Sequence, residues 1–211
     1  MIKNIIFDFD GVLCESVDIK TEAFYEMYLP CGEEIAQKVK EHHINNGGMS
    51  RYDKFRHYEQ TFFAQELTDV KMIKLTEQFS NLVKIKVIEA PFVKGALEFL
   101  EKFSRNYNCF IVSATPIDEM KEIAEAKKIT HFFKEIFGSP KNKIEWGQYI
   151  LDTYKLKAEE ILFIGDAISD YNAAKAHGMH FLLRRTNDNR SLQIESGTRS
   201  IDDLTLLQKK V

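Results

Sequence analysis

Short runs of apolar residues alternate with segments of helical periodicity over much of this chain. The apolar runs span residues 2–9, 109–112, 161–164 and 181–183, and uninterrupted runs of this length are typical of strands buried on both faces. Helical spacing of apolar residues covers 96–103, 117–127, 144–154 and 170–176, the last with Ser169 as a predicted N-cap and Gly178 as a C-terminal stop. Strands that alternate with helices predict an α/β fold with a doubly wound parallel sheet.

Residues 15–89 interrupt this alternation. They show helical periodicity without a convincing strand, and the segments 30–32 and 45–48 mark breaks between helices. The insertion leaves directly after the first predicted strand and returns near Pro91, which places it over the carboxyl edge of the sheet, where α/β sheets bind ligands. We therefore expect a helical cap, residues 15–89, inserted into a core formed by residues 1–14 and 90–211. The tail, residues 200–210, has the pattern of a terminal amphipathic helix.

Composition and charge narrow the function classes. The 211 residues include 29 Lys and Arg against 32 Asp and Glu, a net charge of −3, which lacks the basic excess of a dedicated nucleic-acid binder. Cys14, Cys31 and Cys109 form no CxxC pair, so neither a disulfide framework nor a zinc site is indicated. No signal peptide and no apolar run of about 18 residues is recognisable. We expect a cytoplasmic protein with reduced thiols, without nucleic-acid or membrane partners and with no particular oligomeric state indicated.

Two pairs of aspartates follow predicted strands. Asp8 and Asp10 come at the end of the first strand, and Asp166 and Asp170 follow the strand at 161–164. Because the carboxyl ends of parallel strands meet at one edge of a sheet, both pairs fall at that edge. Carboxylates this close repel one another unless a cation or a shared proton relieves the repulsion. Clustered oxygen ligands suit Mg²⁺, so the four aspartates predict a magnesium site that receives a phosphate.

A hydroxyl and a lysine extend this set. Ser113 ends the strand at 109–112, where its hydroxyl could donate to a phosphoryl oxygen, and Lys141 or Lys143 could supply a fixed positive charge. We favour Lys143 because it directly precedes the predicted helix at 144–154. A carboxylate can attack phosphorus to form an acyl phosphate while cationic groups neutralise the charge on the phosphoryl oxygens. The residues therefore predict phosphoryl transfer.

In this order the residues resemble the four motifs of the haloacid dehalogenase-like phosphohydrolases. The matching segments are DFDGVL from Asp8, Ser113, Lys143, and GDAISD, which contains Asp166 and Asp170. The resemblance implies a Rossmann-like core with a helical cap, Asp8 as the nucleophile and Asp10 as the general acid and base. It also implies that Asp8, the Asp10 carbonyl and Asp166 hold Mg²⁺, with Asp170 completing or supporting the metal site. Carbon–halogen hydrolases of the family lack the second aspartate and its cation pumps have threonine there, so phosphate ester chemistry is favoured.

A short cap segment resembles one branch of this family more closely. Gly47-Gly48-Met49-Ser50-Arg51 is similar to the Gly-x-Ser-Arg segment of sugar phosphomutases and phosphoglycolate phosphatases, in which the arginine reaches an anionic part of the substrate. A guanidinium suits bidentate contact with an anion. The alternative for Arg51, and for Lys54 and His57 on the same predicted helix, is a solvated helix face. The pair His42-His43 is interpreted as a surface helix end, and the cap aromatics as cap core.

The function that we expect is a Mg²⁺-dependent phosphatase that acts on a small phosphorylated metabolite through an aspartyl phosphate. A sugar phosphomutase of the β-phosphoglucomutase type is the enzymatic alternative, because it would use the same Asp8 and Asp10. The Gly165-Asp166 pair favours the phosphatase, since Glu-Asp is typical of the mutases at this point. A phospho-aspartate switch without turnover is the alternative from another class, although its acidic pair would be adjacent in sequence.

Overall fold

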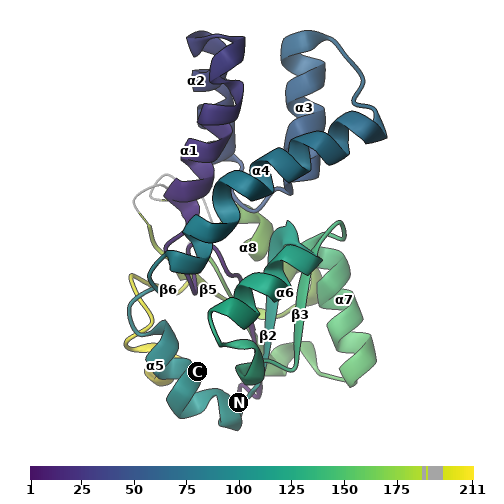
Figure 1. Ribbon diagram of the computed structural model, residues 1–211. Coiled ribbons are helices and arrows are strands. Elements are labelled where there is room, and N and C mark those ends of the chain that lie inside the picture. The colour runs from purple at the N-terminus through teal and green to yellow at the C-terminus, as the bar shows by residue number, and fades with distance from the viewer. Residues whose placement is uncertain (187–188, 190–196) are drawn as a thin grey trace.

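The computed structural model describes residues 1–186, 189 and 197–211, which form a parallel sheet covered by helices (Figure 1). The strands are β1 (Asn4–Phe7), β2 (Asn108–Pro116), β3 (Glu135–Ser139), β4 (Ile161–Gly165), β5 (His180–Arg184) and β6 (Ser200–Ile201). Their order is β3-β2-β1-β4-β5-β6, and all neighbours are parallel. The predicted doubly wound α/β fold is confirmed. Strand order reverses between β1 and β4, and the crevice beyond that point is where such sheets bind ligands.

Each face of the sheet packs on its own helices. Apolar residues alternate along the central strand, because side chains of a strand point to opposite faces in turn. Ile5 and Phe7 of β1 belong to the core that includes α5 (Ala96–Phe103) and α6 (Ile117–Ala126). Ile6 belongs to the core that includes α7 (Lys143–Tyr154) and α8 (Ile168–His177). Burial on both faces explains why the strands are continuous apolar runs.

Four further helices extend beyond the carboxyl edge of the sheet, as Figure 1 shows above the strands. They are α1 (Val17–Tyr28), α2 (Glu33–Asn45), α3 (Arg51–Phe63) and α4 (Asp69–Glu89). Ser50 and Thr68 cap α3 and α4, since their side chains accept hydrogen bonds from the backbone N–H of Asp53 and Lys71. Buried aromatic rings from α1, α3 and α4 pack together between the helices: Phe24, Phe55, Tyr58 and Phe79.

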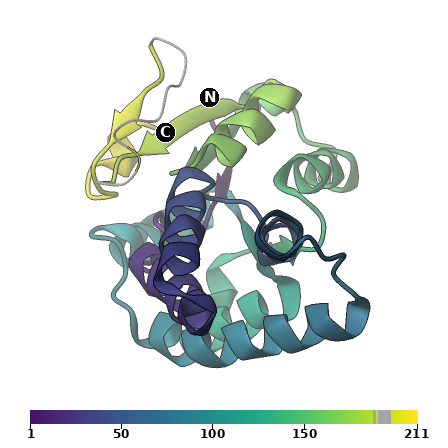
Figure 2. The same ribbon diagram turned by 90° about the horizontal axis from the view of Figure 1, so that it is seen from above.

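The chain enters and leaves these four helices at neighbouring points. The backbone N–H of Glu15 donates to the Pro91 carbonyl, and that of Val93 donates to the Leu13 carbonyl. Seen from above, α1 and α2 lie side by side, α3 is viewed nearly end-on, and α4 runs along one edge of the view (Figure 2). This arrangement accords with the expected cap, while the division of the chain at residues 14 and 90 stays a prediction. Short 3-10 helices complete the structure at Leu29–Cys31, Ser104–Asn106, Thr130–Phe132, Ala158–Glu160 and Leu207–Lys209.

Two local expectations were wrong, and one strand was missed. Strand β3 was not predicted, because its sequence, EIFGS, is short and ends in residues that do not favour strands. The tail forms β6 and a 3-10 turn instead of a helix, because Asp203 accepts hydrogen bonds from the backbone N–H and the hydroxyl of Thr205 and so favours a turn. Helix α8 begins two residues earlier than predicted, with Ala167 at the N-cap position and Ser169 inside the first turn.

Candidate active site

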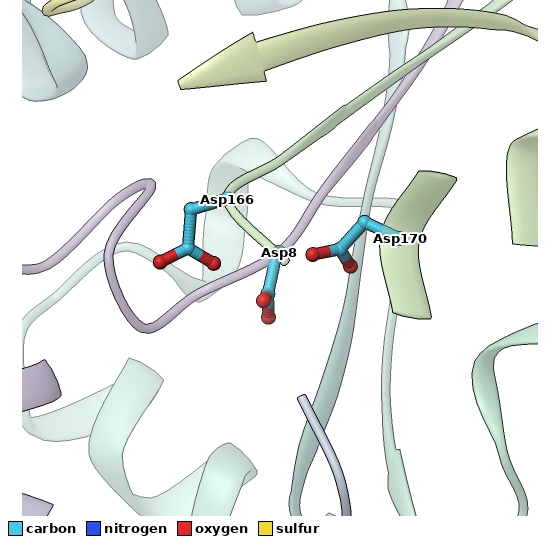
Figure 3. Close-up of side chains that lie close together, drawn as sticks. All are labelled: Asp8, Asp166 and Asp170. Atoms are coloured by element: carbon cyan, nitrogen blue, oxygen red, sulfur yellow. The ribbon is translucent and has the colours of Figure 1, made fainter. Parts of the chain in front are cut away.

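Three of the predicted aspartates lie together at the carboxyl edge of the sheet. Asp8 directly follows β1, Asp166 directly follows β4, and Asp170 lies in the first turn of α8. One carboxylate oxygen from each lies within 4.8 Å of the others, and Figure 3 shows the three groups facing a common space. The pairing of β1 with β4 sets this approach, because the Asp8 N–H donates to the Ile164 carbonyl at 2.9 Å.

Lys143 is the lysine that reaches these aspartates. Its Nζ lies 2.7 Å from Asp8 Oδ2 and 2.5 Å from Asp170 Oδ1, and all three side chains are buried. The Asn142 capping box starts α7 at this lysine and so fixes its place. Lys141, the other candidate, lies over the rings of Trp146 and Tyr149.

The electrostatics of the cluster favour a bound cation. Three carboxylates face one ammonium, and burial raises the pKa of Asp8, an effect that Asp170 and Asp10 strengthen and Lys143 opposes. Loss of solvation also raises the pKa of Asp166, together with the charges of Asp8 and Asp170. Burial alone would lower the pKa of Lys143, but Asp170 and Asp8 raise it above its ordinary value. Hard oxygen ligands with this excess of negative charge fit a divalent ion such as Mg²⁺.

A glycine is required at position 11 because the turn after Asp10 passes close to the Asp166 side chain. Its φ of +74° is a left-handed conformation that side chains disfavour. A Cβ atom at this position would lie 2.1 Å from Asp166 Oδ2. The glycine therefore lets the turn after Asp10 pass beside the Asp166 carboxylate.

The Asp10 carboxylate lies apart from that cluster, in contact with the cap. It accepts hydrogen bonds from Ser16 Oγ at 2.6 Å, Lys20 Nζ at 2.5 Å and Thr115 Oγ1 at 3.2 Å. Burial would raise the pKa of Asp10, but the Lys20 charge and these hydrogen bonds lower it overall. Sequence reasoning missed Lys20 and Ser16; the signal available was their four-residue spacing, which puts both on one side of the first cap helix.

Ser113 is buried within β2, which continues past the predicted end to Pro116, and its hydroxyl accepts a hydrogen bond from the Thr115 backbone N–H at 3.1 Å. Together with Lys143 it lines a cavity bounded by the cap segment Gly47, Gly48 and Met49. The same three cap residues also line the adjoining cavity, which contains Asp8, Asp10 and Asp166. Five predicted residues thus line these two cavities: Asp8, Asp10, Ser113, Lys143 and Asp166. Asp170 lies behind them in contact with Lys143, and the roles assigned to all six residues stay predictions.

Arg51 lines the cavity of Asp8, yet its guanidinium is already paired. Its Nη1 and Nη2 donate to the two carboxylate oxygens of Glu119 at 2.9 and 2.7 Å, and Nη1 also donates to Ser80 Oγ at 2.7 Å. Glu119 belongs to α6, so this buried ion pair joins α3 of the cap to the core. Arg51 is therefore not part of a solvated face, and its predicted contact with substrate stays a prediction.

Two other cap residues were expected at the surface and are buried instead. Lys54, one turn after Arg51 on α3, is 2% exposed, and His43 at the end of α2 is 8% exposed. Lys54 Nζ lies 2.9 Å from His43 Nδ1, and both residues line the cavity of Asp8 and Asp10. A charged residue at helical spacing usually faces solvent, and here the folding of α3 against the sheet edge reverses that expectation.

Comparisons with known proteins agree with this geometry. Residues 5–183 match the family model described as haloacid dehalogenase-like hydrolase. A phosphoglycolate phosphatase of Aliivibrio fischeri is 27% identical over 197 residues, which cover 85% of this chain and 82% of that protein.

Solved structures of low sequence identity share the fold. β-Phosphoglucomutase from Clostridium difficile superposes with a TM-score of 0.75 at 17% identity, covering 100% of this chain and 97% of its own. A putative hydrolase of the same family from Bacillus subtilis, bound to magnesium, gives a TM-score of 0.73 at 15% identity, covering 99% of this chain and 98% of its own. The resemblance expected from the motifs is confirmed. In the part of the chain that the structure describes, no helix is both long and apolar enough to cross a bilayer.

Proposed function

The chain belongs to the haloacid dehalogenase-like hydrolases and is a phosphatase of that family, and on this premise we propose that it is Mg²⁺-dependent and works through an aspartyl phosphate on Asp8. The observation that carries the proposal is the position of Lys143, whose ammonium contacts Asp8 and Asp170 in a cluster of three buried or partly buried aspartates. A fixed cation beside a carboxylate nucleophile is what attack on a phosphate dianion requires.

In the proposed reaction an Asp8 carboxylate oxygen attacks phosphorus, the bond to the ester oxygen breaks, and the leaving oxygen takes a proton from Asp10. Water then attacks the phosphorus of the aspartyl phosphate while Asp10 accepts its proton, which releases inorganic phosphate and restores the Asp8 carboxylate. Lys143 and the Ser113 hydroxyl would contact the phosphoryl oxygens. Asp8, Asp166 and Asp170, with the Asp10 carbonyl, would hold Mg²⁺, which supplies positive charge against the phosphoryl oxygens.

Lys20 would set the balance between the two steps. Its contact with Asp10 lowers the pKa of that carboxyl and favours the basic form, which is the form that removes a proton from water. Protonation of the leaving oxygen needs the acid form. We infer that this pairing must loosen when a phosphate ester occupies the cavity.

The position of the cap helices favours a small substrate. The cavity of Asp8 and Asp10 is also lined by residues of α1, α2, α3 and α4, so a bulky protein or nucleic-acid chain would meet these helices. The curated relative is named a phosphoglycolate phosphatase, which makes a small phosphorylated carboxylic acid the first substrate to test.

The proposal is tested by phosphate release from a panel of phosphorylated metabolites with Mg²⁺. We expect turnover by the wild type, loss of it with a chelator, and its return when Mg²⁺ is added back. Asp8→Asn should keep the fold, shown by an unchanged circular dichroism spectrum, and lose turnover because an amide does not attack phosphorus. Full activity after exhaustive chelation, or turnover by Asp8→Asn, would contradict the proposal. Isomer formation without net phosphate release would instead indicate a phosphomutase.

A further inference from the structure

The cavity between the cap and the sheet edge is lined by two lysines and one arginine, and two of these three side chains are paired with carboxylates of the protein. Lys20 pairs with Asp10, and Arg51 pairs with Glu119 through both of its terminal nitrogens. The third, Lys54, has His43 as its recorded hydrogen-bonding partner and no carboxylate partner among the described residues. Lys54 is thus the lysine of this cavity that has no carboxylate partner among the described residues.

Burial makes that arrangement costly. Lys54 is 2% exposed and lies between His43 and the ring of Phe24, with Nζ 5.5 Å from the ring centroid. A buried ammonium without an anionic partner loses more hydration than a neutral hydrogen bond and a ring contact return. Lysine side chains are long enough to reach solvent from many helix positions, so this one is held in the cavity by its surroundings.

His43 orients the ammonium. An ammonium has no acceptor, so Lys54 Nζ donates to His43 Nδ1, which fixes the neutral ring as the tautomer protonated on Nε2. The His43 ring in turn packs on Phe24 at 4.8 Å between centroids. One N–H of Lys54 is therefore directed to His43, and the remaining N–H donors are available to a ligand in the cavity that Lys54 lines.

We propose that Lys54, positioned by His43, binds a carboxylate on the organic part of the substrate, so that the enzyme selects small phosphate monoesters that carry a carboxylate. This inference rests on the proposed phosphatase function. A single ammonium beside a neutral histidine matches one negative charge. A second phosphate would need more donors, and the fork of Arg51 that could provide them is occupied by Glu119.

The first test compares two esters of similar size on the wild type: 2-phosphoglycolate, which has a carboxylate, and 2-hydroxyethyl phosphate, which has an alcohol in its place. A generic aryl phosphate reports turnover that does not depend on this contact. Loss of a hydrogen bond to a charged group lowers binding affinity by about 10- to 100-fold. We therefore expect kcat/KM for phosphoglycolate to exceed that for 2-hydroxyethyl phosphate by about 10- to 100-fold. Equal values for the two esters, or a preference for ethylene glycol bisphosphate over phosphoglycolate, would overturn the inference.

The second test uses Lys54→Met, which keeps the length of the side chain and removes its charge. The preference for phosphoglycolate over 2-hydroxyethyl phosphate should fall to within a few-fold of unity, mainly through KM, and the loss on the aryl phosphate should be clearly smaller than the loss on phosphoglycolate. Lys38→Met, an exposed cap lysine paired with Glu34 in the same helix, is the control and should keep the preference. Equal losses on all three esters in a variant with a normal melting curve would assign Lys54 a structural role instead.

The outcomes separate this inference from the proposed function. Turnover of the aryl phosphate that depends on Asp8 and shows no preference for the carboxylated ester would leave the phosphatase proposal standing and remove the role of Lys54. Absence of any phosphate release by the wild type with Mg²⁺ would remove both. Binding of phosphoglycolate to Asp8→Asn, measured by calorimetry, gives a readout without turnover, and adding Lys54→Met should weaken it by the same 10- to 100-fold.

Discussion

Asp10 is the residue whose surroundings bear most directly on its expected role. It lies on the same chain turn as Asp8, yet its carboxylate is held by Ser16 and Lys20 of the cap and by Thr115 of the core. General acid and base help by a positioned side chain is worth about 10²- to 10⁴-fold. We expect Asp10→Asn to slow turnover by at least about 10²-fold.

Single-turnover kinetics check this expectation, because both formation and hydrolysis of the aspartyl phosphate should slow. Lys20→Met is a useful companion variant, since it leaves the carboxyl in place and removes the charge beside it. A change confined to KM in Asp10→Asn would make Asp10 a binding residue and contradict its assignment as acid and base.

Gly11 gives a second prediction at the scale of one residue. Gly11→Ala adds a methyl group that meets the Asp166 carboxylate and forces a left-handed backbone on alanine, which by itself costs roughly 1–2 kcal/mol. Gly32→Ala is the matched control, because Gly32 also has positive φ but a Cβ there would meet nothing within 4 Å. We expect Gly11→Ala to weaken Mg²⁺ binding in calorimetry, whereas Gly32→Ala binds the ion normally. Equal affinity in both variants would show that Gly11 does not shape the metal site.

At the scale of one helix, α3 carries a prediction about stability and pH. Burial lowers the pKa of Lys54 to about 7 from 10.5, with Lys20 contributing and Asp10 opposing, and the neighbouring His43 has a pKa well below its ordinary value. Between about pH 7 and 10.5 the unfolded chain binds the proton that the folded protein has lost at Lys54. The free energy of unfolding therefore rises with pH across that window because of Lys54. Below the window the charged Lys54 side chain is buried in the folded protein, and its full desolvation cost lowers the free energy of unfolding.

Lys54→Met should remove the penalty. We expect its melting temperature to exceed that of the wild type at pH 6 and the gain to shrink towards pH 10, as measured by differential scanning calorimetry. Lys38→Met, at the surface of α2, should show no such pH-dependent gain. A loss of stability at pH 6 would contradict the account of Lys54 as a buried cation without an anionic partner.

The sequence predicted those features that are local to a strand end. Asp8, Asp166 and Asp170 could be grouped because β1 and β4 are continuous apolar runs that end at these residues. The partners of Asp10 and the burial of Lys54 were not predicted, because they depend on how the cap helices pack over the sheet, and the spacing of Ser16 and Lys20 shows only that the two share one side of a helix. Strand β3 was not predicted because its five residues, which end in Gly-Ser, show little alternation of apolar and polar positions.

At the scale of the whole molecule, the buried pair of Arg51 and Glu119 joins cap to core. Removing one partner leaves the other buried and charged, which costs about 3–5 kcal/mol. We expect Arg51→Met and Glu119→Gln each to destabilise the protein, and the double variant to lose less than the sum. Urea unfolding of the four proteins provides the double-mutant cycle. Additive losses would show that the two side chains do not depend on each other in solution.

In the proposed reaction, Asp8 carries the phosphoryl group during turnover. Mixing the Mg²⁺-loaded protein with a radiolabelled aryl phosphate, quenching with acid within milliseconds and mapping the labelled peptide tests it directly. We expect a label on the peptide that contains Asp8. The label should be released by hydroxylamine, absent from Asp8→Asn and lost at least as fast as phosphate is produced. Phosphate release without label on the protein at any time, or a label that persists for many minutes without turnover, would contradict it.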